Sequence, residues 1–251
     1  GTSFPVGKVN RYRLYPMDFE EFCWANNMQN QTEEAHNAIK MLRKPLITSG
    51  FKDVFQQYLA IGGMPAAVSE WIENKNLNTI EMILKNILAD YKDDFSKHTS
   101  NAESRKIGNL WQSIPHQFAK EKHKFIYKTI DPSARGREYA FALDWLLDAG
   151  LIYKINLTTR GDKLPLSFYA NNSDFKIYAL DVGLLRQLAS LPASVVVGDR
   201  NLWSNFGGAF AENFILQQLR SLGFDETYYW ASNTDNANQP KGESELDFIV
   251  S

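Results

Sequence analysis

The order of patterns between residues 100 and 168 constrains the fold of this chain more than any other feature. Three helical segments come first and two stretches of alternating apolar residues follow, which is the order of a winged helix. The first helix is expected to start at Ser100 and Glu103, which have the spacing of a capping box. Pro115 is expected to open a second, short helix. The apolar face of the first helix has residues three and four positions apart: Ile107, Leu110, Trp111 and Ile114.

A third helix and a β-hairpin complete this predicted unit. Ser133 is expected to cap the helix, and Gly150 is expected to end it. Residues 151–157 then alternate as a strand and the chain turns at Gly161. The partner strand is expected over residues 164–168, where apolar and other residues alternate again.

Helical patterns also dominate the chain before residue 98. Residues 31–97 read as a small helical domain, with breaks at Pro45 and at a glycine turn over 62–65. Residues 11–22 favour a strand followed by a helix that Asp18 caps. The sequence therefore predicts a mostly helical α+β chain.

Composition and charge exclude several classes of protein. The chain has 27 Lys+Arg against 29 Asp+Glu, a formal net charge of −2, so no overall basic field directs it to nucleic acid or to anionic membranes. The single cysteine, Cys23, excludes an internal disulfide framework and fits a reducing compartment. No apolar run approaches the roughly 20 residues that cross a bilayer, and the first ten residues lack the apolar core of a signal peptide. A cytoplasmic protein with no membrane segment is expected.

One local stretch departs from this slightly acidic balance. Between Arg105 and Arg137 there are eight basic and two acidic residues, and such an excess of positive charge is what contacts with phosphates need. The alternative is a solvated surface, or a winged helix that docks a protein. The candidate nucleic-acid-binding residues are Arg105, Lys106, Lys120, Lys122, Lys124, Lys128, Arg135 and Arg137.

Two carboxylates near the end of the chain have unusual positions. Glu212 lies on or beside the apolar stripe of a predicted helix, and Asp247 stands between Leu246 and Phe248 in a predicted strand. A charge in such a place needs a partner or a metal. Together Glu212 and Asp247 are candidate ligands of Mg²⁺. The alternative places Glu212 at the rim of the core and pairs Asp247 with a nearby arginine.

Several motifs follow one another along the chain in a characteristic order. They include Ser3-Phe4-Pro5-Val6-Gly7-Lys8, Gly62-Gly63-Met64-Pro65, Tyr91-Lys92-Asp93-Asp94-Phe95, Asp144-Trp145-Leu146-Leu147-Asp148-Ala149-Gly150 and Glu245-Leu246-Asp247-Phe248. Their order resembles one family, the bacterial and archaeal AAA-type ATPases that carry a C-terminal domain of unknown function, and the resemblance covers nearly the whole chain. By this resemblance, residues 1–98 are the end of the ATPase core and a helical lid, 99–192 a winged-helix domain, and 193–251 an incomplete, restriction-endonuclease-like α/β domain.

The resemblance implies an ATPase as the parent protein, with ATP and Mg²⁺ as its cofactors. The phosphate-binding loop of such ATPases would lie before Gly1, so this chain is expected to be a fragment that holds no cofactor and no catalytic residue and does not hydrolyse ATP alone. Glu212 and Asp247 correspond to the first two acidic motifs of the nuclease-like domain. The Glu-x-Lys strand that would complete them is expected beyond Ser251, which leaves the metal site incomplete.

Three functions follow from these observations. The leading hypothesis is a winged helix that binds DNA through the basic stretch, within a cytoplasmic ATPase. A second is a protein-docking module with no nucleic-acid role, and a third is part of an ATP-gated, Mg²⁺-dependent nuclease. The physiological substrate and the oligomeric state do not follow from the sequence.

Overall fold

The computed structural model of the chain is mostly helical α+β, as the sequence predicts. Within the residues that it describes, it has ten α-helices, two short 3-10 helices and one four-stranded sheet. None of these helices is long and apolar enough to cross a membrane. The described residues are 7, 9–10, 12–45, 49–97, 99–118, 124–198, 203–232 and 244–250.

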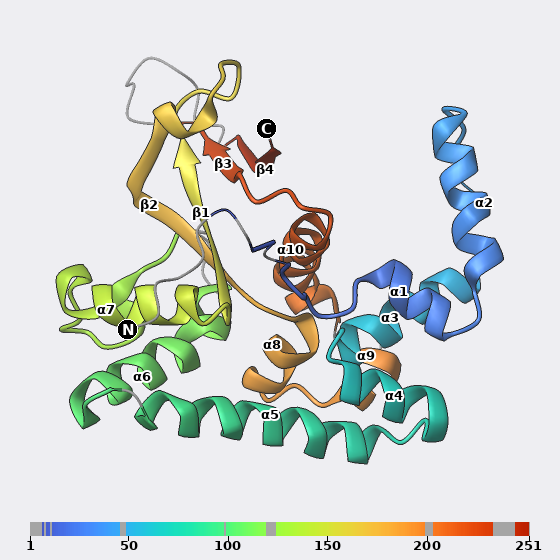
Figure 1. Cartoon of the computed structure of the whole chain (residues 1–251), viewed down its shortest axis with the longest axis horizontal. Helices are drawn as coiled ribbons and strands as arrows, with labels where there is room; N and C mark the ends of the chain where they lie inside the picture. The colour runs from blue at the N-terminus through green and yellow to red at the C-terminus, as the bar shows by residue number, and fades with distance from the viewer. Residues whose placement is uncertain are drawn as a thin grey trace.

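Five helices form the first part of the molecule. The longest, α5, runs along one side and reaches from α4 to α6 (Figure 1). Helix α2 projects away from the other helices, and Thr32 is its buried residue. The five are α1 (Phe19–Ala25), α2 (Gln29–Lys40), α3 (Ser49–Ile61), α4 (Pro65–Asn74) and α5 (Leu77–Lys97).

The second part combines the remaining helices with the sheet. Helices α6 and α7 pack together at one end of α5, and β1 leaves directly from the end of α7 (Figure 1). The elements are α6 (Asn101–Phe118), η1 (Tyr127–Thr129), α7 (Gly136–Asp148), β1 (Ile152–Thr158), η2 (Leu166–Tyr169), β2 (Ala170–Ala179), α8 (Val182–Leu188), α9 (Ala193–Gly198), α10 (Trp203–Ser221), β3 (Thr227–Ala231) and β4 (Glu245–Val250).

The sheet has the strand order β2-β1-β3-β4. Strands β1 and β2 form an antiparallel hairpin in which Ile152 faces Ala179. Strand β3 pairs parallel to β1, with Asn156 beside Tyr228, and antiparallel to β4. The hairpin of the expected winged helix and the strands of the expected nuclease-like segment therefore share one sheet across the boundary expected at 192/193.

Several helix boundaries are confirmed. Asp18 caps α1 in a capping box with Glu21. The Ser100 hydroxyl accepts a bond from the Glu103 backbone N–H, and the Glu103 carboxylate accepts one from the Ser100 N–H. Helix α7 ends at Asp148, and Gly150 follows with a φ of +69° that favours glycine.

Two predictions of helix starts were wrong. Helix α6 continues through Pro115 to Phe118. Its last turn is stabilised by the Gln117 side-chain amide, which donates to the Ile126 carbonyl and accepts from the Ile126 N–H. Ser133 does not cap α7, because its backbone N–H and its hydroxyl both donate hydrogen bonds to the Asp131 carboxylate. The N-cap residue of α7 is Arg135.

The partner strand of the hairpin was also misplaced. Residues 166–169 form η2, and β1 pairs with residues 170–179. Of the alternating residues over 164–168 only Leu166 is buried, while Leu164 and Phe168 are exposed, whereas Phe175, Ile177 and Ala179 in β2 are all buried. Likewise, the described residues 12–17 form no strand.

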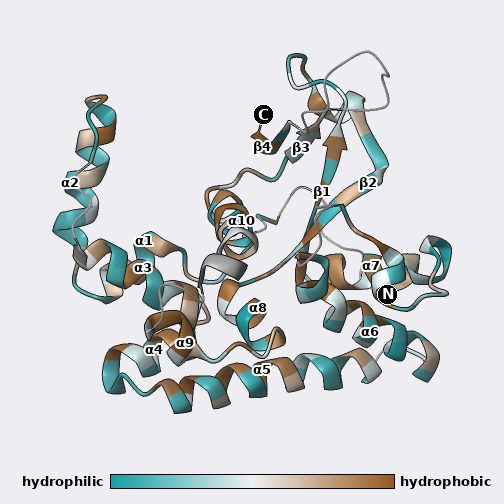
Figure 2. Ribbon diagram, turned by 180° about the vertical axis from the view of Figure 1, so that it is seen from behind, coloured by the Kyte–Doolittle hydropathy of each residue, from teal (hydrophilic) through white to brown (hydrophobic). Residues whose placement is uncertain are grey.

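Three hydrophobic clusters fill the interior, and α8 joins two of them. Leu185 packs in the cluster of α6, α7 and the hairpin, while Val182 and Leu184 pack with α1, α3, α4 and α5. The third cluster, which includes Tyr178 and Leu216, lies between the sheet and α10. Figure 2 shows hydrophobic colour where α4 and α9 lie together and on α10. The helical layer and the α6–β2 unit therefore share a continuous interior through α8.

A buried carboxylate holds the start of α8. Asp181 is fully buried and accepts three hydrogen bonds: from the Gly63 backbone N–H (2.6 Å), the Leu184 N–H (3.0 Å) and the Gln217 side chain (3.1 Å). Burial raises the pKa of Asp181, and these hydrogen bonds oppose that effect. The Gln217 amide also donates to the Tyr58 hydroxyl at 2.9 Å. One carboxylate thus connects the turn after α3 with α8 and α10.

Two glycines let the backbones approach at this point. Gly62 has a φ of +79°, and a Cβ on it would overlap the Asp181 carboxylate. A Cβ on Gly183 would overlap the Ile61 carbonyl oxygen. The turn expected over residues 62–65 is confirmed, and its tight contact with α8 explains why glycine is needed there.

We expect Asp181→Ala to lower the free energy of unfolding by about 3 kcal/mol, because it leaves buried donors without an acceptor. Asp181→Asn keeps one acceptor oxygen and should lose less. Urea denaturation followed by circular dichroism measures the change. Asp93→Ala, on the exposed face of α5, is the control and should change stability by less than about 0.5 kcal/mol. Equal stabilities of Asp181→Ala and Asp93→Ala would contradict the role of Asp181.

Candidate functional site

The first turn of α7 carries two arginines. Arg135 is the N-cap residue and Arg137 the second residue of the helix, and both side chains are exposed. Neither makes an ion pair with a carboxylate that the structure describes. Helix α7 buries Tyr139, Ala142 and Leu146 on its other face. Packing of that face therefore leaves Arg135 and Arg137 on the side of α7 that faces solvent.

Neighbouring elements bring further cations to this end of α7. The Tyr127 ring of η1 lies 3.1 Å from where a Cβ on Gly136 would be, so η1 and the first turn of α7 are in contact. The Lys106 ammonium lies 6.0 Å from the centre of the Tyr139 ring. These contacts place α6, η1 and the start of α7 next to one another, and their exposed surface is here called the basic face. Its exposed cations without a described carboxylate partner are Arg105, Lys128, Arg135 and Arg137.

The other predicted basic residues have different surroundings. Lys124 pairs with Asp174 at 3.0 Å, so its charge is already balanced. Lys106 is half-buried beside Tyr139. Lys120 and Lys122 lie outside the described residues. Four of the eight predicted residues, Arg105, Lys128, Arg135 and Arg137, are therefore exposed and without a described carboxylate partner.

A second arrangement joins the hairpin to α10 and β4. The Lys176 side chain of β2 is only 3% exposed. Its ammonium lies 2.7 Å from a Glu245 oxygen, 3.2 Å from an Asp247 oxygen and 3.5 Å from a Glu212 oxygen. The structure thus brings Glu212 and Asp247 together, as predicted, and adds Glu245. We call these four residues the lysine–carboxylate cluster.

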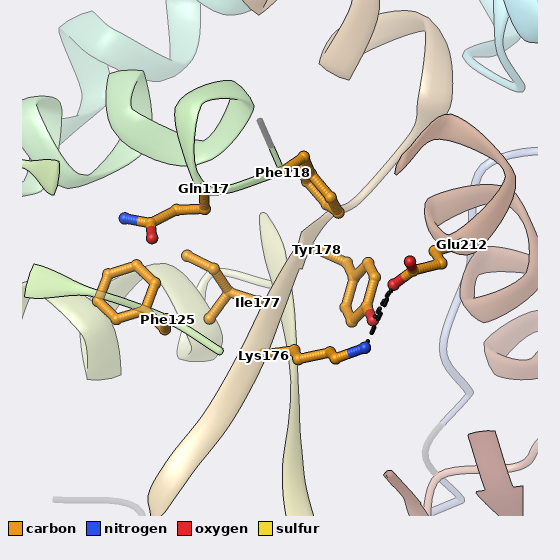
Figure 3. A pocket seen from close by; sticks show the side chains of 7 residues that line it. All are labelled: Gln117, Phe118, Phe125, Lys176, Ile177, Tyr178 and Glu212. Atoms are coloured by element: carbon orange, nitrogen blue, oxygen red, sulfur yellow. Dashed lines mark hydrogen bonds and ion pairs between the residues drawn. The ribbon is translucent and has the colours of Figure 1, made fainter. Parts of the chain in front are cut away.

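Aromatic residues complete the surroundings of the cluster. The Tyr178 hydroxyl donates to the same Glu212 oxygen at 3.0 Å, and Figure 3 shows Lys176 and Tyr178 converging on that carboxylate. The Tyr229 ring lies 5.1 Å from the ammonium, in cation–π range. The adjoining cavity, which Gln117 and Phe118 also line, has a volume of about 10 Å³. That is room for about one water molecule, and too small for a nucleotide.

Electrostatics keep the lysine charged. Burial by itself would lower the pKa of Lys176, but the carboxylates outweigh this effect and raise it. Burial, and then the charge of Glu212, raise the pKa of the Tyr178 phenol well above its ordinary value. At neutral pH the cluster therefore holds an ammonium and a protonated phenol, both donating to carboxylates.

The cluster does not fit Mg²⁺ in this arrangement. Mg²⁺ needs oxygen ligands at about 2.1 Å in an octahedron, and the Lys176 ammonium occupies the centre that all three carboxylates share. Across the described residues, no group of three or more His, Cys, Asp or Glu side chains is arranged to hold a metal ion. The partner that Glu212 and Asp247 require is a lysine, supplied by a strand 36 residues before Glu212.

Sequence reasoning missed Lys176, Tyr178 and Glu245. A signal for the lysine was present, because Lys176 stands between Phe175 and Ile177 in a strand that is buried on both faces. A charge at such a position needs a counter-charge. The strand was expected at the wrong residues, however, so this signal was not used.

Residues 52–195 match the model of a family described as Domain of unknown function (DUF8612). The match covers more than half of the chain. The chain belongs to this family. The DUF8612 region begins in α3 and ends in α9, so it contains the basic face and Lys176. Glu212, Glu245 and Asp247 lie outside it. No curated protein and no solved structure matches the chain.

We expect Lys176→Met to lower the free energy of unfolding by about 2 to 3 kcal/mol at pH 7, because it leaves three carboxylates without their cation. A lysine with a raised pKa contributes stability that is present below about pH 10.4 and is lost as the pH rises through its folded-state pKa. The difference between wild type and variant should therefore narrow above pH 10.4.

Urea denaturation at pH 7 and above pH 10.4 measures this difference. Lys163→Met, which removes an exposed lysine from the hairpin loop, is the matched control and should behave as wild type at both pH values. If Lys176→Met unfolds at the same urea concentration as the control at pH 7, the cluster does not stabilise the fold.

Proposed function

We propose that the DUF8612 unit of this chain binds nucleic acid through the basic face. The observation that carries the proposal is the pair Arg135 and Arg137, exposed on either side of Gly136 at the first turn of α7 and without a described carboxylate partner. Helix α7 precedes the β1–β2 hairpin, as the recognition helix of a winged helix precedes its wing. The N-terminal residues of a recognition helix contact base edges or phosphates.

The physical chemistry of this end of α7 favours an anion. The first backbone N–H groups of a helix have no partner within the helix and carry a partial positive charge. Two guanidinium groups add charges that bind phosphate in a bidentate manner. Lys128 on η1 and Arg105 on α6 add two exposed cations on the neighbouring elements, which increases the positive charge available to phosphates. Because the chain as a whole has a formal net charge of −2, binding to an anion depends on this local excess of positive charge.

The resemblance to AAA-type ATPases supports a wider proposal for the parent protein. In it, a cytoplasmic ATPase carries this unit and uses ATP and Mg²⁺ in a core outside the present residues. The basic face would then bind nucleic acid while the ATPase core hydrolyses ATP. The lysine–carboxylate cluster does not support the nuclease alternative, because the Lys176 ammonium takes the place among its carboxylates that Mg²⁺ would need.

A second candidate function is protein docking, and α2 favours it. This helix projects from the body of the molecule (Figure 1). Ile39, Met41 and Leu42 at its far end are exposed, Leu42 to 96%. Apolar side chains gathered at the tip of a projecting helix are typical of a surface that contacts another protein.

We expect a fluorescent DNA duplex to bind the chain and to lose about 150-fold in affinity between 50 and 200 mM salt, the effect of four phosphate contacts. Arg135→Ala with Arg137→Ala should weaken binding at least tenfold at 50 mM salt and reduce the slope of log affinity against log salt by about 2. Fluorescence anisotropy titrations at several salt concentrations measure both quantities.

Lys40→Ala with Arg43→Ala is the matched control. It removes the same charge from the far end of α2, and duplex affinity should change little. Absence of binding by the wild type at 50 mM salt would reject the proposal and favour docking through α2. An equal loss in both double variants would assign the binding to net charge instead of the basic face.

A further inference from the structure

The far end of α2 combines exposed apolar side chains with positive charge. Ile39, Met41 and Leu42 are exposed there, Leu42 to 96%. Three exposed cations lie among and directly after them in the chain, and none makes an ion pair with a carboxylate that the structure describes. These cations are Lys40, Arg43 and Lys44. Residues 39–44 are here called the α2 tip.

The backbone of the α2 tip places a leucine where glycine is usual. The Leu42 N–H donates to the Ile39 carbonyl and the Arg43 N–H donates to the Ala38 carbonyl, which are the two hydrogen bonds of a Schellman motif. Leu42 has a φ of +54°, a conformation that costs a leucine free energy and that glycine adopts freely. Because Leu42 is almost fully exposed, packing against the described chain does not offset this cost. A contact with another molecule would offset it.

Helix α10 has an apolar side that the sheet does not cover. Leu216 takes the side of α10 that is buried against the sheet. On the other side, Leu222 is 68% exposed and Ile215 is 43% exposed, and Figure 2 shows hydrophobic colour on this helix. The uncovered apolar residues, here called the α10 stripe, are Ile215, Leu219 and Leu222 at positions i, i+4 and i+7, followed by Phe224.

Carboxylates surround the end of the α10 stripe. Asp225 and Glu226 directly follow the stripe and are exposed. The Ser221 hydroxyl, in the last turn of α10, donates to the Asp18 carboxylate at 3.4 Å. The Arg220 cation is buried and bonds the Asp225 backbone carbonyl, so its guanidinium does not face the solvent. The stripe therefore ends in a negative surface, opposite in sign to the α2 tip.

The two surfaces match each other and are both uncovered in a single copy. Helix α2 projects from the body of the molecule (Figure 1), and Leu42 and Leu222 are both exposed, so neither surface covers the other within one chain. We propose that the chain forms a two-fold dimer in which the α2 tip of each copy packs on the α10 stripe of the other.

This arrangement satisfies both apolar surfaces and both charge patterns. Packing removes the leucines of the tip and of the stripe from water, and the cations of the tip face the carboxylates beside the stripe. A reciprocal contact uses both surfaces of both copies, so the assembly closes at two chains. The inference rests on the docking role of α2, for which it names the partner, and is independent of nucleic-acid binding by the basic face.

Analytical ultracentrifugation of the purified chain at a series of concentrations tests the dimer. The mass should rise from that of one chain to that of two, with a micromolar dissociation constant. Leu42→Gly should weaken dimerisation by about tenfold or more, and it should not lower the thermal midpoint, because glycine suits the left-handed turn. Leu164→Gly removes an exposed leucine outside both surfaces and should dimerise as wild type.

Two charge-reversal variants test which surfaces meet. Lys40→Glu with Arg43→Glu reverses the charge of the α2 tip, and Asp225→Lys with Glu226→Lys reverses the charge beside the α10 stripe. Each double variant alone should stay monomeric, because like charges then face each other. An equal mixture of the two double variants should dimerise again, since both contacts of a mixed dimer join opposite charges.

A wild type that stays monomeric at every concentration would overturn the proposal. If that monomer still binds the DNA duplex, the dimer fails and the nucleic-acid proposal stands. Growth beyond two chains would overturn the two-fold arrangement. Undiminished dimers of both double variants, or no association in their mixture, would overturn the pairing of the α2 tip with the α10 stripe.

Discussion

The hydrogen bonds of Asp181 are the interaction on which the rest of the structure depends. Its carboxylate is buried where the turn after α3, the start of α8 and the middle of α10 meet. A buried charge is costly unless donors surround it, and here the donors come from three distant parts of the chain. Each part therefore loses stability if another is displaced. This is why the helical layer and the sheet behave as one interior although their sequences suggest separate units.

The same short segment carries two other buried charges, Lys176 and Arg186, each five residues from Asp181. Lys176 ties β2 to α10 and β4 through carboxylates, and Arg186 ties α8 to α5 through Glu81 at 3.0 Å. Residues 176–186 thus place three charged side chains, Lys176, Asp181 and Arg186, inside an otherwise apolar interior. The basic face depends on this segment indirectly, because the hairpin that follows α7 includes Lys176.

Much of the basic face could be predicted, because exposure and local charge follow from helical periodicity. Arg135 and Arg137 stay in water since Tyr139 and Leu146 take the buried side of α7. The lysine–carboxylate cluster was predicted only in part. Glu212 and Asp247 stood out as charges in apolar patterns, but their partner depends on the pairing of β1 with β2 and β3. Alternation over 164–168 pointed to the wrong strand, since a two-residue period does not show which strand has a core to face.

The sequence by itself determined the mostly helical α+β class, the cap at Asp18, the box at Ser100 and the turn at Gly62. These features depend on bonds between neighbours in the chain and on periodicity. The tertiary structure decided the strand order, the partner of Glu212 and Asp247, the continuation of α6 through Pro115, and the side of α10 that stays exposed. The physical reason is that these depend on which distant groups share a buried volume, where an unpaired charge or hydroxyl is costly and only the folded chain brings the partner close.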